Sequence, residues 1–173
     1  AMIHVANDMT ERRFTFKDMK DASSQSANYF KSLGIKRGDR VMLVLKRHYQ
    51  FWFAILGLHK LGAIALPATN QLMEHDFVYR FQAADVSAVV CTADGDTATQ
   101  VELAEKTANI HLTKIMVGGS REGWHDFDEE YKLFSRRYER AEDAPCGSDP
   151  MLMLFTSGTT GYPKMATHSY KYA

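Results

Sequence analysis

The sequence has 173 residues, with 21 lysines and arginines balanced by 21 aspartates and glutamates. This length is enough for one domain with a substantial core. A net charge of zero is not typical of nucleic-acid-binding proteins, and the longest apolar run, residues 51–58, is too short to span a bilayer. We therefore expect neither a nucleic-acid partner nor a membrane span.

The cysteine content and the N-terminal residues indicate the cellular compartment in which we expect the protein. The only two cysteines, Cys91 and Cys146, do not make a disulfide framework, and we interpret both as structural, with Cys91 in a buried strand. Residues 1–14 contain polar side chains and no apolar segment of the kind found in signal peptides. These features together predict a reducing, cytoplasmic location.

Strand and helix patterns alternate along residues 13–120, which we expect to form one subdomain. Apolar runs without alternation predict strands covered on both faces, and amphipathic or uniformly apolar segments predict helices between them. The predicted strands are residues 13–16, 41–45, 63–67, 87–91, 114–117 and 151–154, and the predicted helices are residues 17–33, 48–61, 74–84 and 96–108. This order predicts an α/β fold with mainly parallel sheets and helices on both faces.

The alternation stops between residues 121 and 150. This segment is polar and charged, and we interpret it as a surface excursion containing one amphipathic helix over residues 126–137. The sheet is expected to resume at Met151. Residues 151–173 then form a strand followed by a loop of unusual composition.

The loop contains Thr156, Ser157, Gly158, Thr159, Thr160, Gly161, Pro163 and Lys164. Hydroxyls and backbone N–H groups are donors for a polyanion, the glycines permit close backbone approach, and one lysine supplies positive charge. This pattern predicts a phosphate-binding loop. A flexible linker and a turn with a coincidental lysine are the plainer alternatives. It is not a Walker A loop, because Pro163 stands where that motif needs its second glycine.

The ordered string Thr-Ser-Gly-Thr-Thr-Gly-x-Pro-Lys resembles the phosphate-binding signature of the adenylate-forming, or AMP-binding, superfamily. Residues 58–67, which place Leu-Gly-Ala before an apolar strand, resemble a second and weaker motif of that superfamily. Met165 departs from the glycine that many members carry. Pro-Lys-Met followed by His168 and Ser169 is most similar to the medium-chain acyl-CoA synthetases.

The resemblance implies that residues 1–173 are a partial N-terminal AMP-binding domain of a ligase. That ligase would activate a carboxylic acid, expected to be a fatty acid, with ATP and Mg²⁺ and transfer the acyl group to coenzyme A. In the family, the adenine pocket, the acyl pocket, the acidic magnesium ligand and a catalytic lysine follow the phosphate loop. The resemblance therefore implies no catalytic residue in this chain and no adenylation by the chain alone; self-association stays possible.

Two alternatives stay open. The chain is a non-catalytic nucleotide- or phosphate-binding module that reuses the loop, or it comes from a different adenylate-forming enzyme, such as an aryl-CoA ligase or a peptide-synthetase adenylation domain.

Other polar clusters give weaker signals. His125, Asp126 and Asp128 have the chemistry of metal ligands, but a solvated acidic loop explains them more simply. Residues 94–96 indicate a turn, and residues 46–48 a positive, solvated helix entry. His168 is notable only because it follows the phosphate loop, and a packing role explains it equally well.

Overall fold

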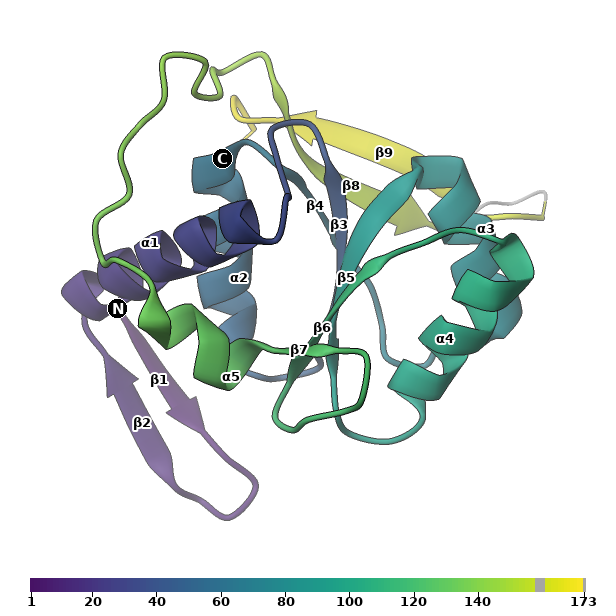
Figure 1. Ribbon diagram of the computed structural model, residues 1–173, viewed down its shortest axis with the longest axis horizontal. Coiled ribbons are helices and arrows are strands. Elements are labelled where there is room, and N and C mark those ends of the chain that lie inside the picture. The colour runs from purple at the N-terminus through teal and green to yellow at the C-terminus, as the bar shows by residue number, and fades with distance from the viewer. Residues whose placement is uncertain (158–160, 173) are drawn as a thin grey trace.

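The computed structural model describes residues 1–157 and 161–172. A two-stranded antiparallel hairpin, β1 (Met2–Val5) and β2 (Glu11–Phe14), precedes the main body of the fold. The main body is a seven-stranded sheet in the order β7-β6-β5-β3-β4-β8-β9. Figure 1 shows the helices packed on both sides of this sheet, with the hairpin projecting from it.

The strands of the main sheet are β3 (Arg40–Val44), β4 (Ile64–Pro67), β5 (Val86–Thr92), β6 (Thr113–Val117), β7 (His125–Asp126), β8 (Pro150–Thr156) and β9 (Lys164–Ser169). Every pair is parallel except β8–β9, which is antiparallel. The central strand β3 is buried on both faces, as its unbroken apolar sequence requires. The predicted α/β fold with a mainly parallel sheet is confirmed.

Two pairs of helices cover opposite faces of the sheet. One face carries α1 (Phe16–Ser32) and α2 (Gln50–Leu61), and the other carries α3 (Glu74–Ala84) and α4 (Thr97–Ala108). Among the described residues, no helix combines the length and the apolar character needed to cross a membrane.

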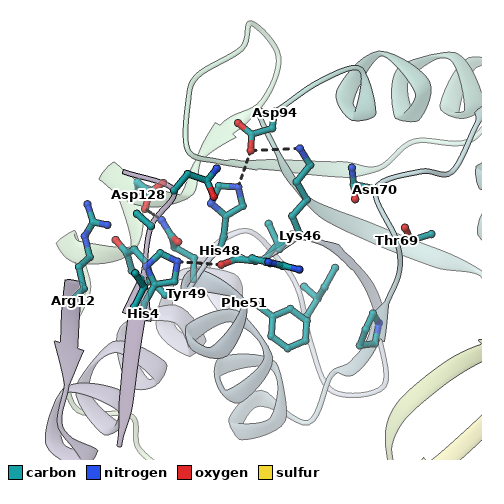
Figure 2. A pocket seen from close by; sticks show the side chains of 18 of the residues that line it. His4, Arg12, Lys46, His48, Tyr49, Phe51, Thr69, Asn70, Asp94 and Asp128 are labelled. Carbon is teal, nitrogen blue, oxygen red and sulfur yellow. Dashed lines mark hydrogen bonds and ion pairs between the residues drawn. The ribbon is translucent and has the colours of Figure 1, made fainter. Parts of the chain in front are cut away.

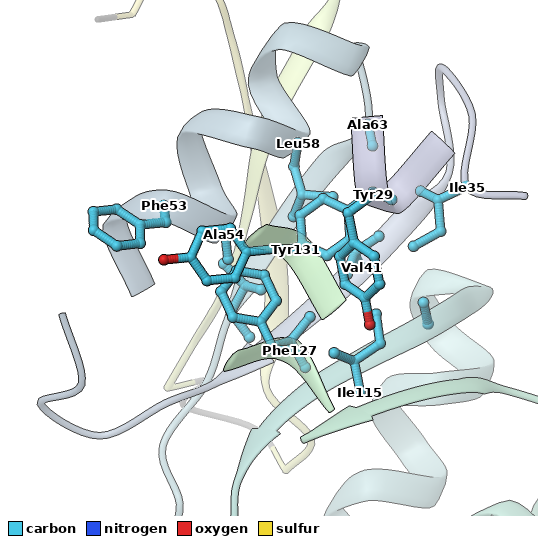
Figure 3. Close-up of a cluster of buried hydrophobic side chains, with 14 of the residues drawn as sticks. Tyr29, Ile35, Val41, Phe53, Ala54, Leu58, Ala63, Ile115, Phe127 and Tyr131 are labelled. Atoms are coloured by element: carbon cyan, nitrogen blue, oxygen red, sulfur yellow. The ribbon is translucent and has the colours of Figure 1, made fainter. Parts of the chain in front are cut away.

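The core beneath α1 and α2 is rich in aromatic side chains. Figure 3 shows Tyr29 of α1, Phe53 of α2, Phe127 and Tyr131 converging there. The rings of Phe127 and Tyr131 stack with their centroids 4.8 Å apart, and Phe127 is fully buried. The segment after β6 therefore contributes to the core, although most of its residues are polar.

The helix expected over residues 126–137 is much shorter than predicted. An α-helix, α5 (Phe127–Glu130), passes into one 3₁₀ turn, η1 (Tyr131–Leu133), and Phe134 is extended. The side-chain amides of Gln25 and Asn28 in α1 donate hydrogen bonds to backbone carbonyls of the next residues, at 2.9–3.1 Å. These tertiary contacts hold the segment along α1 in a non-helical conformation, and the helix does not continue past Leu133.

Candidate functional site

The predicted phosphate loop connects β8 to β9, so it is the turn of an antiparallel hairpin. Thr156 and Lys164 are partners in that hairpin, and the Thr156 hydroxyl donates to the Lys164 carbonyl at 3.3 Å. Gly161 has a φ of +116°, a conformation that residues with side chains rarely adopt. Thr156, Ser157 and Lys164 are exposed and Pro163 is half-buried, whereas Gly158, Thr159 and Thr160 lie outside the described residues.

A single side chain from α3 contacts both arms of this hairpin. The Tyr79 hydroxyl donates to the Pro163 carbonyl at 2.9 Å, and its ring stacks on Tyr162 with centroids 4.7 Å apart. The same ring lies edge-on to Phe155, the residue before Thr156, with centroids 6.1 Å apart. Helix α3 therefore fixes where the loop begins and where it ends.

Other polar side chains gather at the same edge of the sheet. Parallel strands bring their carboxyl ends together, and ligands bind such sheets where consecutive connections leave toward opposite faces. Strands β3 and β5 are neighbours of this kind, because β3 leads to α2 on one face and β5 to α4 on the other. A cavity of about 1180 Å³ lies at this point, and we name it the switch-point cavity.

Both basic and acidic side chains line the switch-point cavity (Figure 2). Lys46 and His48 follow β3, and a carboxylate oxygen of Asp94, which follows β5, lies 3.6 Å from the Lys46 Nζ and 3.6 Å from the His48 Nε2. His48 also shares a hydrogen bond of 2.8 Å with the Thr92 hydroxyl. Lys46 has a φ of 44°, which is uncommon outside glycine and indicates a constrained turn.

The opposite wall of the cavity is also held by hydrogen bonds. Asp128 accepts from the Gln50 side chain and from the Gly118 backbone N–H, both at 2.8 Å. The β1–β2 hairpin adds His4, whose ring is 3.1 Å from the Arg47 carbonyl. The cavity thus joins residues from the hairpin, from α2 and from three strand ends.

Sequence reasoning interpreted residues 46–48 as a solvated helix entry and residues 94–96 as a turn, and it did not connect them. The structure brings these two segments into one cavity. The available signal was that each follows a buried strand directly. That signal predicts a shared cavity only if β3 and β5 are known to be neighbours in the sheet. The order of the strands along the chain does not reveal this.

The candidate metal ligands form hydrogen bonds and ion pairs with other residues of the chain. Asp126 caps the start of α5, accepting from the Glu129 N–H at 3.2 Å, and His125 lies 3.2 Å from Glu130. Across residues 1–157 and 161–172, no three His, Cys, Asp or Glu side chains are grouped as metal ligands would be. These residues do not fit a magnesium site, and we assign no Mg²⁺ ligand to them. His168 packs against Tyr172, with ring centroids 4.1 Å apart.

Comparison with known proteins points to one family. The sequence model described as "AMP-binding enzyme" matches residues 1–173. Acyl-coenzyme A synthetase ACSM1, mitochondrial, of Mus musculus is 35% identical over 161 residues, covering 92% of this chain and 27% of that protein. ACSM3, mitochondrial, of Homo sapiens is 32% identical over 161 residues with the same two coverages. The chain thus spans little more than a quarter of these curated relatives.

Solved structures agree with the sequence comparison. The acyl-CoA synthetase of Brucella canis has a TM-score of 0.82 at 27% identity, over 98% of this chain and 30% of that one. The anthranilate CoA ligase AuaEII has a TM-score of 0.83 at 24% identity, over 92% of this chain and 30% of that one. At that identity the second likeness shows the fold alone.

Proposed function

We propose, because this chain belongs to the family of AMP-binding enzymes, that it forms the phosphate-binding part of an acyl-coenzyme A synthetase. In the reaction proposed for the whole protein, a carboxylate oxygen attacks the α-phosphorus of ATP and pyrophosphate leaves. The thiolate sulfur of coenzyme A then attacks the acyl carbon, AMP leaves with the bonding electrons, and the thiol proton passes to solvent. The acid proposed is a fatty acid, and Mg²⁺ is proposed to accompany ATP.

The observation that carries this proposal is the hairpin loop with its support from α3. Attack of a carboxylate on ATP brings two anions together, so the site needs donors and positive charge placed in advance. Thr156, Ser157 and Lys164 are exposed at the loop end of the hairpin, where a polyphosphate has access. We assign Lys164 as the positive charge on the β- and γ-phosphates, and the remaining loop residues, Gly158, Thr159, Thr160, Gly161 and Pro163, as their cradle. Donors aimed at developing charge typically contribute about 3–4 kcal/mol each.

The switch-point cavity lies at the same edge of the sheet, and we assign it to the phosphate-bearing end of coenzyme A. Arg12, Lys46 and Arg47 line it, and their charges suit phosphate groups. Asp94 pairs with Lys46 and so offsets part of this charge, while Asp128 is bonded to the neutral groups of Gln50 and Gly118.

The aryl-CoA ligase alternative draws only on the fold of AuaEII, so it gains no support for an aromatic substrate. The ACSM1 and ACSM3 names include "mitochondrial", whereas the cysteine usage of this chain predicted the cytoplasm; the cytoplasmic location stays a prediction. Activity in the assay below would exclude the alternative of a non-catalytic phosphate-binding module.

The test is ATP–pyrophosphate exchange, measured in the protein that carries this chain together with the remainder of the enzyme. Straight-chain fatty acids should support exchange, and Lys164→Ala should lower it roughly hundredfold while leaving the urea unfolding midpoint unchanged. Lys106→Ala, at an exposed lysine of α4, is the matched control and should be neutral. Exchange within twofold of wild type in Lys164→Ala would remove Lys164 from the phosphate site.

Tyr79→Phe tests the support from α3 in the same assay. It deletes the hydroxyl that bonds the Pro163 carbonyl and keeps the ring that stacks on Tyr162. Loss of one hydrogen bond costs about 0.5–1.5 kcal/mol, so the KM for ATP should rise by up to about tenfold with little change for the acid. An equal rise in both KM values would indicate a general loss of structure.

A further inference from the structure

A second cavity, of about 660 Å³, lies on the α1–α2 face of the molecule. Its walls are Lys20 of α1, Lys60 of α2, and Arg136, Arg137 and Arg140 of the segment that leads to β8. Lys60 comes shortly before β4 begins, so this cavity is near the amino edge of the sheet, away from the hairpin loop. We name it the arginine cavity.

The arginine-bearing segment is fixed to α1 by hydrogen bonds. Gln25 donates to the carbonyls of Lys132 and Phe134, at 3.0 and 3.1 Å. Asn28 donates to the carbonyls of Ser135 and Arg137, at 2.9 and 3.0 Å. These four contacts place Arg136 and Arg137 beside the lysines before any ligand arrives, which lowers the entropic cost of binding.

The far end of the segment is fixed as well. Arg37 and Asp149 form an ion pair of 2.7 Å, and Asp149 also accepts from the Cys146 N–H at 2.8 Å. Pro145 packs close to Gly62 at the end of α2, where an added Cβ would meet it at 3.3 Å. The cavity is thus closed by a strap held at both ends.

The charges around the cavity are not balanced. Five cationic side chains line it and no carboxylate does, in a chain whose formal net charge is zero. Within the described part of the chain, the one ion pair that any of the five makes is Arg137–Glu139, at 3.8 Å between two largely exposed side chains. Asp21, which pairs with Lys17 and does not line the cavity, offsets this charge only in part, and an anion in the cavity would relieve the remaining repulsion.

Lys60 shows this imbalance most clearly. Its ammonium donates to the Lys20 carbonyl at 3.0 Å and to the Ser24 hydroxyl at 2.8 Å, both neutral acceptors. Burial and the nearby charge of Lys20 lower the Lys60 pKa below its ordinary value, and the nearby Asp21 carboxylate opposes this only in part. A half-buried ammonium with neutral hydrogen-bond partners carries an unfavourable desolvation free energy, and an anionic ligand would offset it.

We propose that the arginine cavity binds an organic phosphate carrying at least two negative charges. Guanidinium groups match phosphate oxygens with paired N–H donors, and Lys60 adds a point charge from the floor. The volume exceeds that of a phosphate group alone and lies in the range of small-molecule sites. Tyr138 and Pro145 line the same cavity and give the organic part an apolar surface. This inference does not rest on the function proposed for the hairpin loop.

The first test maps binding to residues. Pyrophosphate is the probe, and the chain carries Lys164→Ala so that the hairpin loop contributes least. Labelling with phenylglyoxal, followed by mass spectrometry of peptides, should show Arg136 and Arg140 protected at least about fivefold by pyrophosphate. Arg13, exposed on the β1–β2 hairpin, is the internal control and should label equally in both conditions. Equal labelling of Arg136 and Arg140 with and without pyrophosphate overturns the proposal.

The second test uses matched variants and calorimetry in the same background. The double variant Arg136→Ser and Arg140→Ser should weaken pyrophosphate binding about tenfold or more, since it removes two guanidinium groups that donate charged hydrogen bonds to phosphate oxygens. Lys31→Ser with Lys106→Ser removes the same charge from exposed helix positions and should leave the Kd unchanged. Equal loss in both double variants would show a general charge effect and would overturn the site. Binding of an acidic peptide but not of pyrophosphate would overturn it too.

Discussion

The switch-point cavity and the arginine cavity differ in how their charges are balanced. In the first, Lys46 and His48 face Asp94 across the ends of two strands. In the second, lysines from two helices meet arginines from a strap, and no carboxylate lines the space. In the first cavity the Lys46 ammonium is paired with a lining carboxylate, whereas in the second the strap is joined to α1 through its backbone carbonyls and its cationic side chains face no lining carboxylate.

This difference follows from the elements that build each cavity. The carboxyl ends of parallel strands form one edge, so side chains of both signs converge there and can pair. The strap is attached through its carbonyls to Gln25 and Asn28, and this attachment leaves its side chains free to point at the helices. Both cavities rest on the core beneath α1 and α2, so changes within that core test how each wall is supported.

The largest loss of stability is expected from a change at the wall of the switch-point cavity. Phe127 is fully buried and precedes Asp128, so Phe127→Ala should lower the free energy of unfolding by about 3–5 kcal/mol. Urea denaturation measures this change. Phe16→Ala, at a side chain that is 83% exposed, should change it little. Equal losses in the two variants would mean that Phe127 does not anchor that wall.

Beneath the arginine cavity, the contact between α1 and α2 depends on a glycine. A Cβ added at Gly57 would lie 2.7 Å from the Ser26 Cβ and 3.0 Å from the Ala27 backbone nitrogen, so Gly57→Ala forces the helices apart. We expect a loss of about 1–3 kcal/mol in the free energy of unfolding, and weaker pyrophosphate binding. Gly147→Ala is the control, since its Cβ would meet only the flexible Lys171 side chain, at 3.2 Å. A Gly57→Ala protein as stable as this control would contradict the close packing.

Acid should destabilise the arginine cavity through His59, which lines it. Burial lowers the pKa of His59 from its ordinary 6.5, so below pH 6.5 the unfolded chain binds a proton that the folded chain resists. The free energy of unfolding should fall as pH drops below 6.5, by at most about 1.4 kcal/mol at pH 5.5, with no contribution from His59 above that range. His59→Gln should show a smaller fall between pH 7.5 and 5.5, measured by urea denaturation. If the free energy of unfolding falls as much in His59→Gln as in the wild type, a group other than His59 causes the loss of stability in acid.

The smallest expected effect concerns the two cysteines, which differ in burial. Cys91 is buried in β5, and burial raises its pKa to about 12, whereas Cys146 is exposed and hydrogen bonds with Ser148 lower its pKa. Because the thiolate is the reactive form, Ellman's reagent should modify one thiol in the folded chain and two in urea. Cys146→Ser should abolish the reaction in the folded state. Two fast thiols in the folded wild type would contradict the burial of Cys91.

The sequence by itself determined the elements whose patterns are local. Periodicity predicted α3 with the bounds that the structure has, Glu74–Ala84, and unbroken apolar runs predicted the central parallel strands. The phosphate motif was also readable, because its residues are contiguous and their chemistry is visible without the fold. Whether its residues bind phosphate stays a prediction.

Tertiary structure decided the rest. Neither β1 nor β9 was expected, because each lies at an edge and depends on a hairpin partner more than on an apolar pattern of its own. The prediction of a helix over residues 126–137 was wrong beyond Leu133, where Phe134 is extended and amides of α1 bind carbonyls of the segment that follows. Both cavities join segments from separate parts of the chain, such as Lys46 with Asp94 and Lys60 with Arg136. Charge pairing across such separations depends on strand order and helix packing, and these arise from the summed burial of the whole core.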